Sequence, residues 1–204
     1  MRCLKHSQLF RLAIVLLTVA RAHSGLAQEA VVSSGNWSYA DIPWGASKET
    51  VKRTLVQRGY AFLKTDEDGD LQFDGEISNT KARIVAIFAR DRLVKSGVLI
   101  ATPDNKAREV FCDMRETLLR KYGAPSSDFH FFTSPYYEGD GFEDQAIRLG
   151  KATFAVYWHR DAPEGGQNSI SLSITDALSV IVSYESPAWH QEYERRKTRA
   201  TKDF

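Results

Sequence analysis

Cysteine and histidine are scarce in this chain of 204 residues, and neither sign of charge dominates. Two cysteines and five histidines leave little material for a disulfide framework or a Cys/His zinc site. The formal net charge of +1 argues against general binding to nucleic acid, which needs a basic surplus. No apolar run approaches the roughly 20 residues that cross a bilayer, so we expect no stable membrane span.

The first 27 residues nevertheless have the three parts of a secretory signal peptide. Arg2, Lys5 and Arg11 form a basic start, residues 12–20 form a short apolar run, and residues 25–27 (GLA) form a small-residue cleavage site. The pattern predicts export to the periplasm or the extracellular space, with removal of the leader. Four basic residues and no acidic residue would leave with it, so 23 basic and 26 acidic residues remain, a net charge of −3.

Removal of the leader would leave Cys112 as the only cysteine. Cys3 lies before the apolar run, whereas a lipoprotein cysteine follows it at the cleavage point, so a lipid anchor is not indicated. A single remaining cysteine excludes an intramolecular disulfide in the exported chain. We expect Cys112 to be a packing residue of a helix.

Capping signals and apolar spacing predict helices alternating with groups of short strands. One helix is expected from Ser47, its cap, to Gly59, and a second over residues 105–122 with Asp104 as its cap. A last helix begins near Ser186. The expected strands cover residues 70–78, 82–89, 93–101, 128–133, 144–149, 152–159, 169–175 and 178–184. Several of the connections are too short for parallel crossovers, so neighbouring strands should be antiparallel.

This order predicts an α+β fold built of two similar units, each a helix followed by an antiparallel meander. Together the units would form one twisted sheet with helices on one face, followed by a C-terminal helix. The expected boundaries are 1–27 for the signal peptide, 28–40 for a flexible lead-in, 41–102 and 103–185 for the two units, and 186–204 for the last helix and tail.

The segment Ile42-Pro43-Trp44-Gly45-Ala46-Ser47, followed by a short amphipathic helix that reaches Leu55, carries a family resemblance. It resembles the opening of small exported bacterial helix-plus-meander modules, which include the tandem-unit β-lactamase inhibitor proteins and the small outer-membrane assembly lipoproteins. The chain lacks the lipid-anchored cysteine of the latter and the disulfide cysteines of the former. The resemblance implies a non-catalytic binding role in the cell envelope and assigns no particular binding residue.

Two acidic loops are the candidates for a cation site. Residues 66–70 (DEDGD) look like a calcium loop, but Leu71 and Ile77 stand where that loop needs glycine and a bidentate glutamate. A hairpin turn between two strands accounts for the same acidic and glycine residues. Residues 138–144 form a second acidic loop that also contains glycine. We expect neither a metal nor a cofactor.

The strongest functional signal is a run of aromatic residues at 129–137 (FHFFTSPYY). Tyr136 and Tyr137 follow a proline in a loop, where aromatic side chains often contact partners. Phe132, and Trp158 and His159 on a strand expected nearby, complete the predicted partner-binding surface. The plainer alternative is a loop folded over the sheet edge.

The leading hypothesis is therefore an exported protein that binds a cell-envelope protein and has no catalytic role, with its oligomeric state left open. One rival is a small hydrolase or metal-assisted enzyme built on His130, His159 and the acids Asp140, Glu143 and Asp144. A second rival is a carrier of a small ligand, which would need a closed apolar cavity.

Overall fold

The computed structural model describes residues 37–103 and 105–201. The predicted signal peptide, most of the expected lead-in and the predicted cap Asp104 therefore lie outside the described residues.

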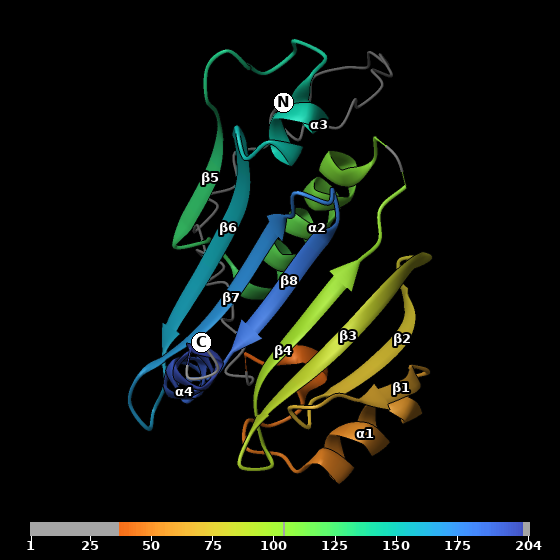
Figure 1. The fold of residues 1–204 in the computed structure, drawn as a ribbon, viewed down its shortest axis with the longest axis vertical. Coiled ribbons are helices and arrows are strands. Elements are labelled where there is room, and N and C mark those ends of the chain that lie inside the picture. Colours follow the sequence, from red (N-terminus) through yellow and green to blue (C-terminus); the bar gives the residue numbers. More distant parts are fainter. Residues whose placement is uncertain (1–36, 104, 202–204) are drawn as a thin grey trace, which may run out of the picture.

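One antiparallel sheet of eight strands runs through the described part of the chain (Figure 1). Its spatial order is β1-β2-β3-β4-β8-β7-β6-β5, so each half of the chain contributes four strands and the halves meet where β4 pairs with β8. With four α-helices, this sheet confirms the predicted α+β class. The strands are β1 (Ala61–Thr65), β2 (Leu71–Ile77), β3 (Thr80–Ala89), β4 (Arg92–Ile100), β5 (Ser127–Phe132), β6 (Ala152–Asp161), β7 (Gln167–Ile174) and β8 (Val180–Glu185).

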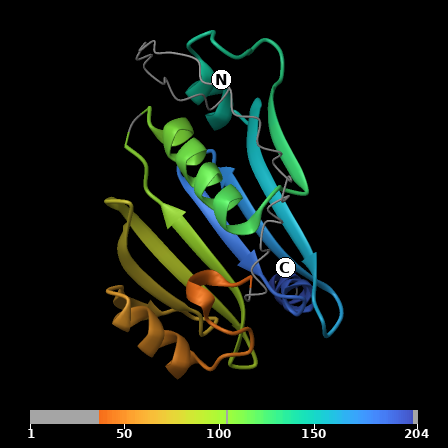
Figure 2. The ribbon, with the colours of Figure 1, turned by 180° about the vertical axis from the view of Figure 1, so that it is seen from behind.

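Two helices cover one face of the sheet, as Figure 2 shows from that side. Helix α1 (Lys48–Gln57) begins where predicted, because the Ser47 hydroxyl accepts a hydrogen bond from the Thr50 amide at 3.3 Å. Helix α2 (Ala107–Tyr122) packs on β7 and β8. A short 3-10 turn, η1 (Tyr39–Asp41), precedes α1.

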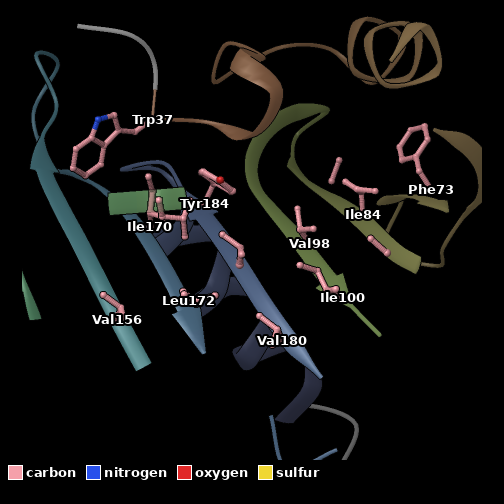
Figure 3. Close-up of a cluster of buried hydrophobic side chains, with 14 of the residues drawn as sticks. Trp37, Phe73, Ile84, Val98, Ile100, Val156, Ile170, Leu172, Val180 and Tyr184 are labelled. Carbon is pink, nitrogen blue, oxygen red and sulfur yellow. The ribbon is translucent and has the colours of Figure 1, made fainter. Parts of the chain in front are cut away.

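The core lies between this helix-covered face and the helices (Figure 3). Alternate residues of the central strands point into it, including Val98 of β4, Leu172 of β7 and Val180 of β8, all 2% exposed or less. Phe111 and Leu118 supply the buried stripe of α2 that the three- and four-residue spacing predicted. The apolar pattern of the strands thus fixes which face of the sheet is buried.

Helix α4 (Trp189–Thr201) lies on the other face of the sheet, at its lower end in Figure 1. The ammonium of Lys95, which alternates with buried Ser96 on β4, lies 4.5 Å from the centre of the Trp189 ring. Further along α4, Arg196 bonds to Asp70 at the start of β2 and to the Phe88 carbonyl. These contacts fasten the C-terminal helix to the first half of the sheet.

Two elements differ from the sequence prediction. The strand expected at 144–149 is wrong: the segment forms helix α3 (Glu143–Arg148). Asp140 stabilises the turn before it by accepting from the Phe142 amide at 2.7 Å. Glu143, Ala146 and Ile147, spaced three and four residues apart, are buried on one side of the helix. Strand β1 was not predicted, because its five residues are mostly exposed and give no alternating apolar pattern.

Two features bear on the expected organisation. Trp37 and Ser38, at the end of the segment expected as a lead-in, are buried, and the Trp37 ring meets the Tyr122 ring at 5.6 Å. Each half has a helix before its four strands, but only the second half has an additional helix, α3, between strands. An internal repeat stays a prediction.

Cys112 of α2 packs, partly buried, against the core, as expected of a packing residue. Its sulfur is disulfide-bonded in this structure. The expectation of a single cysteine applies to the chain after removal of the leader, and it stays a prediction. Among the described residues, no helix combines the length and the apolar character needed to cross a membrane.

Candidate partner-binding face

The face of the sheet opposite α1 and α2, which we call the open face, carries the candidate site. Of the described helices only α4 lies on it, at one end. Its residues form rows across the strands because paired positions point to the same side. The central row runs Val85, Gly97, Ser183, Ser171 and Tyr157, and the next runs Arg83, Leu99, Ile181, Ser173, Ala155 and Phe129.

Small side chains form the floor of the open face. Gly97, Ser171, Ser173 and Ser183 occupy its centre, on β4, β7 and β8. These residues have short side chains or none, so the backbone of the central strands is close to the surface. A partner could therefore approach the sheet closely along this line.

Aromatic rings line one margin of the open face. Phe129 and Phe131 of β5 are 44% and 50% exposed. Tyr157 of β6 lies edge-on to Phe129 at 6.0 Å and is stacked with His159 at 6.3 Å between ring centres. The His159 ring nitrogen Nδ1 lies 3.1 Å from the Ser169 hydroxyl. Exposed, mutually packed rings of this kind are typical of contact surfaces.

A groove of about 680 Å³ crosses the opposite margin, over β1 to β4. Leu99, 38% exposed, contributes to its lining. Arg83 and Asp74, joined through Arg83 Nε at 2.9 Å, lie beside it. The open face thus combines an apolar contact area with polar groups that are already paired.

Two of the predicted site residues do not face solvent on this surface. Trp158 is 1% exposed and belongs to the core, where its indole nitrogen donates to the Gly123 carbonyl at 3.0 Å. Phe132 points to the helix-covered side and packs edge-on against Phe154 at 5.8 Å. Neighbours on a strand point to opposite faces, so Trp158 and His159 could not both be contact residues.

The predicted tyrosine loop leads from β5 to α3. Tyr137 is 65% exposed and Tyr136 is partly buried. The loop is held by its own acids, because Asp140 accepts from the Tyr137 amide at 3.0 Å and Glu143 accepts from the Gly139 amide at 3.1 Å. Tyr137 is therefore exposed to solvent on a loop whose conformation is fixed by these hydrogen bonds.

Phe129, Phe131 and Tyr157 were missed as surface residues. The signal was available in the alternation of residues 127–132, which places Phe129 and Phe131 on one face and His130 and Phe132 on the other. The sequence pattern alone does not say which of the two faces the helices cover.

The residues of the catalytic rival are not brought together. His130 packs against Phe154 on the helix-covered side, with ring centres 4.4 Å apart, whereas His159 lies on the open face. Burial lowers the pKa of His130, which favours its neutral form. Glu143 and Asp144 pair with Arg108 of α2 at 3.3 and 3.5 Å. Across residues 37–103 and 105–201, no three acids, histidines or cysteines are placed to hold a metal.

The acidic loop at 66–70 forms the predicted hairpin turn between β1 and β2. Asp66 Oδ1 accepts from the amides of Asp68 and Asp70 at 3.1 and 2.9 Å, and Gly69 has a φ of +83°. Asp68 and Asp70 pair with arginines of α4. These oxygens thus have partners within the protein.

A pocket of about 420 Å³ lies where η1 meets the ends of α1 and α2. Its lining includes the hydroxyls of Tyr39 and Tyr60, 2.6 Å apart, and Asp41, which pairs with Lys121 at 3.6 Å and with Arg58 at 4.0 Å. Burial raises the pKa of Tyr39 and of Tyr184, so both phenols stay neutral. A phenolic and charged lining is not the closed apolar cavity that the carrier rival requires.

No family model, no curated protein and no solved structure matches this chain. Its function must therefore be inferred from its own geometry.

Proposed function

We propose that the chain is an exported, non-catalytic protein that binds a cell-envelope protein through its open face and the adjoining tyrosine loop. The observation that supports the proposal is a sheet face that the described helices leave uncovered over most of its extent, with exposed aromatic rings at one margin. Monomeric proteins seldom leave contiguous apolar surface without a use for it.

The chemistry of the open face suits a protein partner. Leu99 and Phe129 stand in one row of the sheet with Ile181 between them, so apolar side chains recur along the row. The small residues between them would let the partner come close to the strands. A core of apolar and aromatic contacts with a polar rim is the usual construction of a protein interface.

The cell-envelope location rests on the leader pattern of residues 1–27 and on the small net charge that its removal would leave. A nearly neutral protein has no general attraction to nucleic acid or to anionic lipid. The partner is then expected among proteins of the periplasm or the cell surface.

Affinity capture from the exported fraction, read by mass spectrometry, tests the proposal. Leu99→Asp introduces a charge on the open face, in the row that also contains Ile181, and should reduce recovery of the specific partner at least tenfold. Tyr136→Ala with Tyr137→Ala should also reduce recovery. Val56→Asp is the matched control, because Val56 is 48% exposed on α1, on the other side of the sheet.

The control should capture the partner as the unaltered protein does, and all variants should keep the same circular dichroism spectrum. Equal recovery by Leu99→Asp and the unaltered protein would refute binding through the open face. Loss of recovery with Val56→Asp alone would move the site to the helix-covered side.

A further inference from the structure

The two edges of the sheet are built differently. Strand β1, at one edge, contains an irregularity between Phe62 and Lys64, where its register with β2 shifts. It also carries Lys64, and the ammonium of Lys52 lies 3.7 Å from the Phe62 ring centre. A bulge and lysines are the usual protection of an edge strand against pairing with another chain.

Strand β5, at the opposite edge, has none of this protection. Its register with β6 runs unbroken from Ser127 to Phe132, and its sequence, SDFHFF, contains no lysine and no proline. Phe129 and Phe131 are about half exposed on it. No other strand of residues 37–103 and 105–201 pairs with this side of β5. A regular, apolar edge of this kind is a template for another strand.

The hydrogen-bonding groups that face the free edge can be identified from the ladder with β6. The Thr133 amide donates to the Lys151 carbonyl at 2.7 Å, so Thr133 directs its backbone groups toward β6. In an antiparallel ladder this direction alternates, so Phe129 and Phe131 also face β6. The N–H and C=O groups of Asp128, His130 and Phe132 therefore point outward.

One antiparallel register makes β5 complementary to itself. With the two-fold axis at Phe129, each Asp128 stands opposite His130 of the second copy, and the two Phe129 side chains face each other on the open side. Both contacts of Arg115 with the Asp128 carboxylate use Oδ2, which leaves Oδ1 to accept from the imidazole. A shift of the axis by one residue, to His130, would instead place Asp128 opposite Phe132.

We propose that two copies of this chain associate through antiparallel pairing of β5 with β5, in the register centred on Phe129. The two sheets would then form one continuous sheet, with the open faces on the same side. Phe129 and Phe131 of both copies would form one aromatic cluster across the axis. This self-association is independent of the proposed partner.

The register predicts a cross-link that serves as the test. Opposed residues of a non-hydrogen-bonded antiparallel pair have Cα atoms about 4.5 Å apart, within the range that a disulfide spans. Phe129→Cys should therefore form a covalent dimer under mild oxidation at micromolar concentration. Leu63→Cys is the matched control, because Leu63 is 45% exposed on the protected edge, and it should give at least tenfold less dimer.

Hydrogen exchange of the unaltered protein gives a second readout that needs no substitution. The amides of Asp128, His130 and Phe132 should exchange more slowly as the protein concentration rises, whereas those of β1 should not change. Equal cross-linking of the two cysteine variants would overturn the proposal. So would exchange at these three amides that does not depend on concentration.

Experiments can refute partner binding through the open face and pairing of β5 with β5 independently of each other. Leu99→Asp should abolish partner capture and leave the β5 cross-link of a Phe129→Cys chain intact. If the cross-link is absent while capture persists, β5 pairing is wrong and the binding role stands.

Discussion

The contact between α4 and the first half of the sheet gives the sharpest prediction of stability. Arg196 donates to both carboxylate oxygens of Asp70, at 2.6 and 3.0 Å, to Glu192 at 2.7 Å and to the Phe88 carbonyl at 2.9 Å. The side chains of Asp70 and Glu192 are only 5% and 4% exposed, and that of Arg196 is 16% exposed. We predict that Arg196→Met destabilises the protein strongly.

The size of the loss in free energy of unfolding depends on the groups that Arg196→Met leaves without a partner. Asp70 keeps its bond from the Phe88 amide at 3.0 Å but becomes a buried carboxylate without a cation. Removal of one partner of a buried ion pair costs about 3–5 kcal/mol, and the partial exposure of Arg196 places the loss near the lower end, at about 3 kcal/mol. For a domain of this size that loss corresponds to a melting temperature lower by roughly 6–12 °C.

Urea unfolding at neutral pH measures the loss, and Arg195→Met is the matched control. Arg195 lies next to Arg196 on the same helix and also pairs with Glu192, but its side chain is 55% exposed. We expect Arg195→Met to lower the free energy of unfolding far less than Arg196→Met does, because exposed ion pairs contribute little. Adding Asp70→Asn to Arg196→Met should recover part of the stability, because it removes the unpaired charge. Equal losses from the two arginine substitutions would refute this reasoning.

Two further predictions concern the helices. Ser47→Ala removes the N-cap of α1 and should lower the free energy of unfolding by about 0.5–2 kcal/mol, measured by urea titration; no change would show that the cap is dispensable. Hydrogen bonds from Arg195 and Arg196 lower the pKa of Glu192 below its ordinary value of 4.5. Its contribution is therefore present at neutral pH and lost as the pH falls below 4.5 through the lowered pKa. Glu192→Gln should reduce stability at neutral pH and flatten the acid decline, and an unchanged pH profile would contradict this.

Much of the fold could be predicted from local signals. The cap at Ser47, the apolar stripe that includes Phe111 and the alternation in β3 identified their elements, because each depends on neighbours within a few residues. Helix α3 was missed because a six-residue segment gives too little periodicity to separate helix from strand. The pairing of β4 with β8 joins residues 80 to 90 positions apart, which no local pattern encodes.

The candidate site was predicted less well than the fold. The aromatic run was found, but the face each ring occupies depends on which side of the sheet the helices cover. That choice places Trp158 and Phe132 on the helix side and leaves Phe129 and Tyr157 on the open face. The network of Arg196 with Asp70 joins residues 126 positions apart in the sequence and had no sequence signal.

A photo-cross-linking amino acid at position 99, in the protein as its host exports it, tests the binding role most directly. The account predicts an adduct with one cell-envelope protein from position 99, and none from position 56 on the helix-covered side. Adducts from position 56 with none from position 99 would contradict it.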